Sequence, residues 1–582
     1  MTENASLPLR NDFIPISSNG WPILTQPEIQ SKKNCFHLRA LTPPFIPNTF
    51  LQMQRKICIF LILLTVAIRV PLLGIPFERD EGEYAYIGWR LDHHELPYKD
   101  WMDQKPPAIF WVYHWAFKLP LDPIRAVHLA ALLFAAASAC ALFFLALRFL
   151  EQKWAVLAAL LFVLFSIDPL LYGTEANTEM FMLLPLILSV LFFFRAAASS
   201  RREIILAITA GALIGVSTAF KQVAAVQWPF LVFMFPLFCG RQRPIRRTAS
   251  FAVFSAMGIA AVWGAICVYF SLRHGFGDFV YSVFTHNLEY VKGLSLSDRL
   301  RCLESTLKIL AWDEWPVWLL SVVGLALMLK SRRFQAFLFF LAWWVVSAAG
   351  VSASGYYFPH YFQQLLPVLC LTTAFGADAL DRLAAWKSVS PLLRRAALAT
   401  VCLAPVAMVL LRITFLYSNA EAVNVIYPGS HFAEKQILAQ RLAQVTRPGD
   451  KVFIFGAEPE MLFYAQRVSA TRYIFLFPLF GPYSDAKARQ IATIKEITQN
   501  NPSAMVFLPN ELFFMPGSEQ YFSEWSESYQ LQNFDTDSCL AINPAGQSVV
   551  VTDIPHQHPD ATKGLVFYGT LSVRKTPVLG AR

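Results

Sequence analysis

Acidic residues are concentrated in one short stretch that follows the first strongly apolar run of the chain. Glu78, Asp80, Glu81 and Glu83 fall within the sequence ERDEGEY, residues 78–84. Four carboxylates in six residues are typical of a solvated loop. Carboxylates held at a bilayer surface can also act as a general base toward a hydroxyl, or ligate a divalent cation through oxygen.

The next part of the same stretch places an acid and a base close together. Asp103 and Lys105 are two residues apart in DQKPP, and Trp89, Tyr98 and Trp101 precede them. Aromatic residues interleaved with prolines favour a folded element at the membrane interface over a flexible connector. Lysine is a point-charge partner for phosphate, although a lysine that extends toward the interface is an equally good interpretation of Lys105.

Two other polar positions interrupt apolar sequence. Glu175 and Glu179, in YGTEANTEMF, are four residues apart and would share a face if a helix begins here; acidic capping of a helix start is the alternative. Lys221, in STAFKQVAA, is an ionisable residue between apolar runs, which makes it a candidate functional residue. Phosphate binding and simple interfacial placement both remain open for Lys221.

A fourth segment, SGYYFPHYFQQLLP, is rich in aromatic and amide side chains, among them His360 and Tyr361. Aromatic rings next to amide donors suit a sugar or an isoprenoid. An aromatic belt at the membrane interface would have the same composition without any ligand.

Membrane helices must position these residues. The 582 residues are 55% hydrophobic and only 15% charged, whereas about a quarter of a soluble domain is charged. Apolar runs of about 20 residues can cross about 30 Å of hydrocarbon as helices. The sequence predicts an all-α polytopic membrane protein with about eleven transmembrane helices, at residues 57–75, 126–147, 154–171, 179–194, 204–220, 224–239, 249–271, 315–329, 335–352, 361–379 and 396–415.

Basic clusters in every second loop predict the orientation, because Lys and Arg favour cytoplasmic loops. The clusters are Arg148 with Lys153; Arg195, Arg201 and Arg202; Arg241, Arg243, Arg246 and Arg247; Lys330, Arg332 and Arg333; and Arg382, Lys387, Arg394 and Arg395. They predict a multi-pass protein of the cell inner (plasma) membrane. Residues 1–56 would be a cytoplasmic tail, and residues 57–415 the transmembrane domain with a long first external loop at 76–107. The net charge of +9 then reflects this topology and gives no reason to expect nucleic acid as a partner.

The composition changes after residue 416, and residues 416–582 are predicted to form a small extracytoplasmic α/β domain. HFAEKQILAQRLAQV and YSDAKARQIATIKEITQN read as helices, while KVFIFG and NPSAMVFLP read as strands. The nine cysteines are scattered without a CxxC pair, and no GxGxxG or Walker-type loop occurs, so the sequence predicts neither a disulfide framework nor a nucleotide site.

Four motifs, in this order and spacing, carry a resemblance to a known group of enzymes: RDEGEYAY, DQKPPAIFWVY, GTEANTEMFML and HYFQQLLP. Over roughly residues 57–480 the chain resembles the C-type glycosyltransferase superfamily. Its motifs are most similar to the bacterial enzymes related to dolichyl-phosphate-mannose-protein mannosyltransferases (glycosyltransferase family 39) and to the lipid A aminoarabinose transferase. The resemblance implies transfer of a sugar from a polyprenyl-phosphate donor to an acceptor hydroxyl on the external face, with inversion at the anomeric carbon.

The resemblance also implies roles for individual residues. Asp80 would be the general base, Glu81 would support it or hold a metal, and Asp103 would be the second acid of the loop. Lys105 would contact the donor phosphate, where a fixed cation stabilises the charge of the leaving group. The remaining substrate-binding candidates are Lys221, Glu175, Glu179, His360 and Tyr361. The only cofactor to be considered is a divalent metal ion, at Glu81 and Asp103; Gln104, which separates Asp103 from Lys105, departs from the pattern of the aminoarabinose transferases.

A multi-spanning lipid or sugar transporter or flippase is the competing hypothesis. Such carriers place ionisable groups near the bilayer midplane and commonly contain internal repeats. Here the acids gather in a surface loop and no repeat is visible, so the enzyme is favoured over the carrier and over a non-catalytic receptor. The sequence leaves open which sugar is transferred, whether the acceptor is a glycan, a lipid or a protein, and the oligomeric state.

Overall fold

The computed structural model describes residues 48–240, 242–311, 314–383, 388–481, 483–509, 520–554 and 562–575. Most of the predicted cytoplasmic tail, and Arg241 and Lys387 of the predicted basic clusters, lie outside these residues. Residues from Pro47 onward form one compact unit, which contains both the membrane helices and the C-terminal region.

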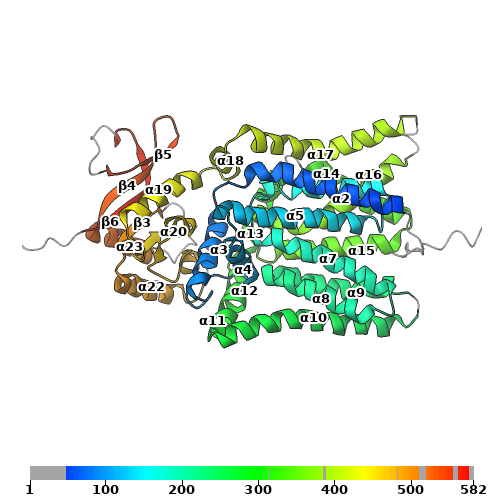
Figure 1. Ribbon diagram of the computed structural model, residues 1–582, viewed down its shortest axis with the longest axis horizontal. Coiled ribbons are helices and arrows are strands. Elements are labelled where there is room, and N and C mark those ends of the chain that lie inside the picture. Colours follow the sequence, from blue (N-terminus) through cyan, green and yellow to red (C-terminus); the bar gives the residue numbers. More distant parts are fainter. Residues whose placement is uncertain are drawn as a thin grey trace, which may run out of the picture. The chain divides into compact units, whose positions relative to one another are not determined.

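Long apolar helices make up the first part of this unit and run side by side in Figure 1. Within the described residues, six are long and apolar enough to cross a membrane, or seven if the bent pair α13 (Leu296–Leu310) and α14 (Trp315–Lys330) is one span. The six are α5 (Pro123–Ala146), α7 (Thr178–Ala198), α8 (Glu203–Phe220), α10 (Pro244–Leu272), α15 (Phe334–Ser352) and α17 (Pro391–Leu416). The protein is therefore multi-pass.

The prediction of eleven spans is not confirmed. Several of the predicted runs form helices that are too short, because 16 residues extend only about 24 Å against about 30 Å of hydrocarbon. The other helices of this part are α2 (Asn48–Arg69), α3 (Arg79–Arg90), α4 (Ala108–Ala116), α6 (Gln152–Phe165), α9 (Gln227–Phe238), α11 (Phe276–Val280), α12 (His286–Lys292), α16 (Leu366–Asp381) and α18 (Asn419–Ile426). Short 3-10 segments interrupt or extend the predicted runs at η1 (Val70–Leu72), η3 (Pro169–Leu171), η4 (Gln222–Val226) and η6 (Pro359–Leu365). The 3-10 segment η2 (Leu91–His93) and the π-helical turn η5 (Tyr281–Thr285) lie outside the predicted runs.

Small residues allow these helices to pack closely. A Cβ atom on Gly211 of α8 would lie 1.8 Å from the carbonyl oxygen of Ser255, and one on Gly258 of α10 would lie 2.1 Å from that of Ile208. Glycine is the residue that permits such backbone approach between membrane helices. Of the 18 most apolar consecutive residues in each helix, 72% are buried in α7 and 22% in α10. Helix α7 is therefore central and α10 peripheral.

The segment at residues 76–107 is folded, as its aromatic and proline content predicts. Helix α3 begins with a capping box in which the Glu78 side chain accepts a hydrogen bond from the Glu81 amide and the Glu81 side chain accepts one from the Glu78 amide. The buried side of α3 includes Tyr84 and Tyr86, both with no exposed surface. This helix carries the acidic motif as an ordered element.

The C-terminal region is a mixed sheet with helices, so the predicted α/β character is confirmed. Its helices are α19 (Phe432–Val445), α20 (Glu460–Ala465), α21 (Phe477–Phe480), α22 (Ala486–Asn500) and α23 (Gln520–Asn533). The strands are β1 (Lys451–Phe455), β2 (Val468–Ser469), β3 (Ala504–Phe507), β4 (Phe534–Ile542), β5 (Ser548–Val551) and β6 (Val566–Arg574), in the order β2-β1-β3-β6-β4-β5. Strand β1 pairs in parallel with β2 and β3, and the other pairs are antiparallel. Helix α17 ends at Leu416.

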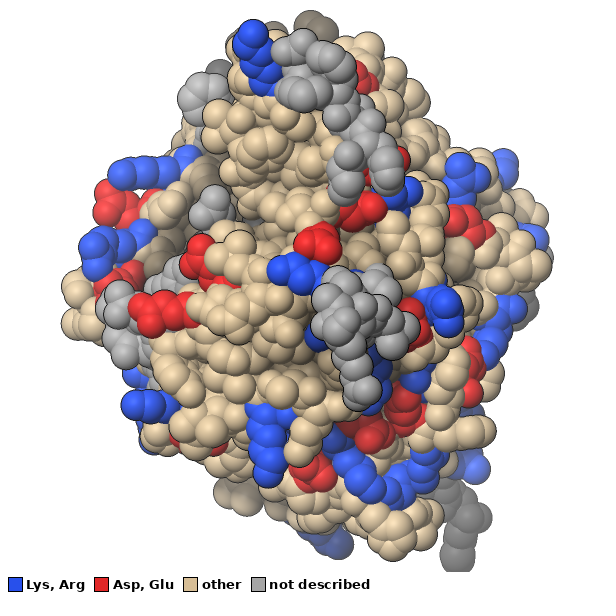
Figure 2. Space-filling model, turned by 90° about the vertical axis from the view of Figure 1, so that its left-hand side faces the viewer, with Lys and Arg blue, Asp and Glu red and all other residues tan. Residues whose placement is uncertain are grey.

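The sheet and its helices lie at the end of the bundle where α3 and α4 are found (Figure 1). Phe453, Phe455, Leu479 and Phe522 are among the fully buried residues of the core of this region. Figure 2 looks onto this end of the molecule and shows acidic and basic side chains intermixed over its described part.

Candidate active site

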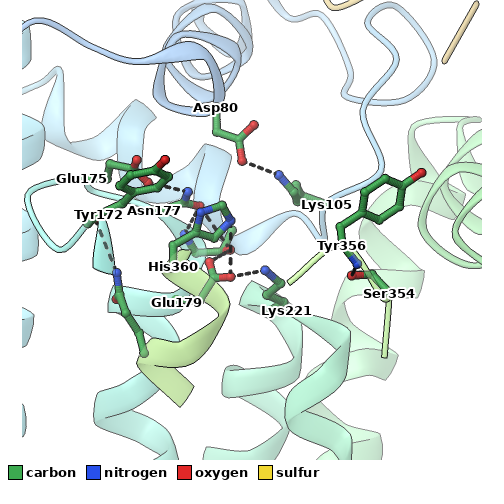
Figure 3. Close-up of polar contacts among 12 residues, drawn as sticks. Asp80, Lys105, Tyr172, Glu175, Asn177, Glu179, Lys221, Ser354, Tyr356 and His360 are labelled. Atoms are coloured by element: carbon green, nitrogen blue, oxygen red, sulfur yellow. Dashed lines mark hydrogen bonds and ion pairs between the residues drawn. The ribbon is translucent and has the colours of Figure 1, made fainter. Parts of the chain in front are cut away.

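Asp80 lies in the first turn of α3, where the helix dipole favours a negative charge. Its side chain is 24% exposed and points toward Lys105, which comes from the loop before α4 (Figure 3). Lys105 Nζ lies 2.9 Å from Asp80 Oδ2 and donates to the Tyr84 hydroxyl at 2.8 Å. The acid and base predicted from ERDEGEY and DQKPP are thus in direct contact, 25 residues apart in sequence.

The charge state of Asp80 follows from its neighbours. Burial acts to raise the pKa of its carboxyl, but the positive charge of Lys105, with smaller effects from His360 and Lys221, outweighs burial and lowers the pKa to about 2. Asp80 is therefore ionised at neutral pH. While Lys105 remains in contact with it, Asp80 is a weak base.

Asp103 is buried beside the lysine. One of its oxygens, Oδ1, accepts a hydrogen bond from the backbone amide of Lys105 at 2.8 Å. Among the described residues the other oxygen, Oδ2, has no hydrogen-bond partner. Burial, with a smaller contribution from the charge of Asp80, raises the pKa of Asp103 to about 6 even though Lys105 opposes the shift. Asp103 thus shapes the loop at Lys105 and carries a proton more readily than an ordinary aspartate.

A second group of polar side chains, around Lys221, lies next to the Asp80–Lys105 pair. Lys221 follows the last residue of α8 and forms an ion pair with Glu179, and its Nζ lies 3.9 Å from the centroid of the Tyr361 ring. His360 Nε2 is 3.8 Å from Glu179 Oε1, and burial lowers the pKa of His360 to about 4, so that the imidazole is neutral at pH 7. Four of the predicted residues are therefore gathered here, and Figure 3 shows three of them, Glu179, Lys221 and His360.

Glu175 and Glu179 do not share a helix face, because α7 begins at Thr178. Asn177 is the N-cap, and its Oδ1 accepts from the Thr178 amide. Glu179 faces Lys221, while Glu175 lies outside the helix and accepts a hydrogen bond from Tyr427 of the segment after α18. Glu175 thus contacts the C-terminal region.

Glu81 points away from the Asp80–Lys105 pair. Its Oε1 atom lies 2.9 Å from His128 Nε2 and accepts from the Ala176 amide at 2.7 Å, and its Oε2 accepts from the Glu78 amide. Glu81 therefore ties α3 to α5 and to the loop before α7. Within the described ranges no group of three or more His, Cys, Asp or Glu side chains is placed to hold a metal ion, and the oxygens of Glu81 are committed to other partners. The part of Glu81 and Asp103 in metal binding stays a prediction.

A cavity of about 280 Å³ opens beside both lysines. Lys105, Glu179, Lys221 and Tyr361 contribute to its wall. The rest of the wall is formed by Gln104, Gln222, Val223, Val283, Phe284, Asn287, Leu288, Tyr290, Val291, Gly350, Ala353, Ser354 and Gln364. The wall therefore combines cations with amides and apolar side chains.

Sequence reasoning missed the amides that hold the loop at Gln104. Gln222 Nε2 and Asn287 Nδ2 donate to the Gln104 carbonyl at 3.2 and 2.8 Å. Their signal was weak, because Asn287 lies in a polar segment between two apolar runs and nothing in that segment resembles a motif. Tyr84, which contacts Lys105, was visible within the acidic motif but had no assigned role.

Comparisons with known proteins agree with this architecture. The family model described as dolichyl-phosphate-mannose-protein mannosyltransferase matches residues 104–277. The fold resembles that of ArnT from Cupriavidus metallidurans bound to undecaprenyl phosphate, with a TM-score of 0.52, 14% identity, and coverage of 92% of this chain and 100% of that one. It also resembles the archaeal oligosaccharyltransferase AglB from Archaeoglobus fulgidus, in complex with an inhibitory peptide and a dolichol-phosphate, with a TM-score of 0.50, 12% identity, and coverage of 90% and 76%. None of the curated proteins matches the chain.

Proposed function

We propose that this chain, which the family model of the dolichyl-phosphate-mannose-protein mannosyltransferases matches over residues 104–277, moves a sugar from a polyprenyl-phosphate-linked donor to an acceptor hydroxyl. The observation that carries this proposal is the contact of Asp80 with Lys105 at 2.9 Å, beside a cavity lined by a second lysine, Lys221. This contact brings together the carboxylate base and the phosphate-binding cation that such a transfer requires.

The donor binds with its phosphate between the two lysines and its isoprenoid along apolar side chains. Val283, Phe284 and Leu288 supply apolar wall next to Lys105 and Lys221 in the cavity. A lipid-linked sugar must keep its tail in hydrocarbon and its phosphate at the interface, and this combination of side chains suits both. The resemblance to a fold solved with undecaprenyl phosphate supports the same class of donor.

The reaction is a single displacement. Asp80 accepts the proton of the acceptor hydroxyl as its oxygen attacks the anomeric carbon, and the bond from that carbon to the phosphate oxygen breaks on the opposite face. The electron pair leaves with the polyprenyl phosphate, and the anomeric configuration is inverted. Lys105 stabilises the negative charge that grows on the leaving phosphate.

Donor binding also activates the base. In the free protein Lys105 holds the pKa of Asp80 at about 2, where a carboxylate attracts protons poorly. A donor phosphate competes with Asp80 for the ammonium group, so its arrival weakens the ion pair and raises the pKa of Asp80. The base thus becomes effective only when the donor is in place.

The remaining residues bind or orient the substrate. Lys221 is the second phosphate partner, and Glu179 keeps it in position from the start of α7. Tyr361 lines the donor cavity, and His360 lies beside Glu179, another residue of its wall. Neutral His360 can exchange hydrogen bonds with sugar hydroxyls at pH 7. Glu175 sits where the acceptor would approach, against the C-terminal region. We place this side of the protein outside the cytoplasm, opposite the basic loops and the N-terminus.

Transfer of radiolabelled sugar from synthetic polyprenyl-phosphate donors tests the proposal. Purified protein in proteoliposomes should consume the donor and release polyprenyl phosphate in proportion to the labelled product. Donor that crosses the bilayer intact, with no polyprenyl phosphate released in the presence of any acceptor extract, would support a flippase instead.

A further inference from the structure

The two halves of the Asp80–Lys105 pair come from different segments, and both segments rest on one stretch of the C-terminal region. This stretch, residues 458–472, runs from just before α20 to just after β2, and we call it the docking segment. Its contacts with α3 control Asp80, and its contacts with the loop at 98–102 control Lys105.

On the Asp80 side, hydrogen bonds and an ion pair join α3 to the docking segment. Arg79 immediately precedes Asp80 in the chain, and its Nε lies 3.1 Å from Glu458 Oε1. The Tyr464 hydroxyl accepts from the Phe77 amide at 2.7 Å. At the other end of α3, the Tyr86 hydroxyl accepts from the Ser469 amide at 3.0 Å.

Gly82 lets α3 approach α20 closely. A Cβ atom at this position would lie 2.4 Å from Glu460 Cβ and 2.5 Å from the Glu460 backbone nitrogen. Real Cβ atoms do not approach backbone so closely, so any other residue would force the two helices apart. The glycine in the motif RDEGEY thus serves the contact with the docking segment.

Glu458 is the central side chain of this contact. It is fully buried, and Lys435 Nζ, also fully buried, lies 3.0 Å from the same oxygen that faces Arg79. A buried charge pair is strongly destabilised when one partner is removed, because the other is left uncompensated. Glu458 therefore fixes the position of Arg79 with little freedom.

On the Lys105 side, the docking segment ends at Arg472. The Met102 amide donates to the Arg472 carbonyl at 3.0 Å, and the Arg472 guanidinium donates to the Tyr98 carbonyl. The Tyr98 hydroxyl in turn donates to the Lys105 carbonyl at 2.7 Å. Arg472 thus reaches the backbone of Lys105 through one intermediate residue.

We infer that the docking segment is a template that sets the separation of Asp80 and Lys105, with Glu458 and Arg472 as positioning residues for the transfer reaction. The inference rests on the proposed function and assigns the C-terminal region a part in the chemistry of the membrane domain. Misplacement of a reacting group by 1 Å can reduce a rate about a hundredfold, so a template of this kind has a large effect on turnover.

The test compares Glu458→Gln with Arg441→Gln in the full-length protein. Arg441 pairs with Asp537 at 2.7 Å within the C-terminal region and, in the part of the chain that the structure describes, forms no hydrogen bond or ion pair with α3, so it controls for loss of an ion pair in the same region. Glu458→Gln should lower kcat for transfer about tenfold or more with the donor KM changed less than about twofold. Arg441→Gln should stay within about twofold of wild type.

A double-mutant cycle separates positioning from general destabilisation. If Glu458 acts through the Asp80–Lys105 pair, Glu458→Gln should lower kcat much less in the Lys105→Ala background than in the wild-type background. Fully additive losses, or transfer by Glu458→Gln equal to that of Arg441→Gln, would overturn the inference. Should Glu458→Gln not fold, Tyr464→Phe removes the acceptor of the Phe77 amide and enters the same cycle. No transfer by the wild type would instead overturn the proposed function, which comes first.

Discussion

Replacement of Lys105 by alanine has the most direct consequence for the proposed mechanism. The change removes an ammonium group that lies 2.9 Å from Asp80 and 2.8 Å from the Tyr84 hydroxyl and that is 15% exposed. Loss of one preorganised donor to a developing oxyanion typically reduces kcat by about 10² to 10³, or about 2.7–4 kcal/mol of transition-state stabilisation. We expect a loss in this range for transfer by Lys105→Ala.

The pH dependence should change as well. Burial acts to raise the pKa of Asp80, and Lys105 is the leading group that lowers it to about 2. Without Lys105 the pKa rises, and the base is protonated at higher pH. The rate is lost as pH falls through the pKa of the base, so the acid limb of kcat/KM should move upward in the variant.

The assay is transfer of labelled sugar from a polyprenyl-phosphate donor between pH 4 and 8, with Lys118→Ala as the control. Lys118 pairs with Asp92 at the surface, where its side chain is 46% exposed, and such pairs contribute about 0–1 kcal/mol. The reasoning would be refuted if Lys105→Ala retained transfer within about twofold of this control, with the same pH profile.

Substitutions at three further positions test other parts of the structure. Gly82→Ala should destabilise the protein by about 1–3 kcal/mol, because the added methyl group meets the Glu460 backbone; a lower Tm in detergent would show it, and an unchanged Tm would contradict the close approach of the two helices. Lys221→Ala should raise the donor KM more than Lys221→Arg does, because the arginine keeps a cation beside Glu179; equal KM values for both would argue against phosphate binding there. Tyr427→Phe should lower the free energy of unfolding by about 1–3 kcal/mol, since it removes the hydroxyl that donates to Oε1 of buried Glu175, and chemical unfolding would measure this.

The sequence predicted the chemistry of the site better than its geometry. Asp80, Lys105, Glu179 and Lys221 could be selected because ionisable residues are rare beside apolar runs, and the first three also lay in motifs that carry the family resemblance. Their pairing could not be predicted, since Asp80 contacts Lys105 across a loop and Glu179 contacts Lys221 across a helix pair.

The fold could be predicted from the sequence only in outline. Apolar composition identifies membrane helices, but it does not reveal where a run is broken by a short 3-10 segment, as at Pro169–Leu171 after α6. In the C-terminal region the amphipathic helices α19 and α22 and the apolar strands β1 and β3 were recognisable. Strands β4, β5 and β6 were missed, because β4 begins FDTDS, with polar residues that do not read as a strand, and its pairing with β6 is long-range.

The role of Glu81 shows what sequence adjacency conceals. Asp80 and Glu81 are neighbours in α3, and the resemblance pairs them in one catalytic unit. Successive residues of a helix point about 100° apart, so Asp80 faces Lys105 while Glu81 faces His128 in the interior. Any influence of Glu81 on the reacting groups is therefore less direct than the motif suggests.

The central claim is that Asp80 is the base of a sugar transfer, and a single-turnover measurement with Asp80→Asn tests it most directly. The assay uses enzyme in excess over labelled donor with a saturating acceptor extract. Asp80→Asn would be compared with Asp92→Asn, a change at the Lys118 pair in the same segment, residues 76–107. The account predicts that Asp80→Asn binds donor but transfers sugar at least about a hundredfold more slowly, as expected for loss of a general base, while Asp92→Asn matches wild type. Transfer by Asp80→Asn at the wild-type rate would contradict the account.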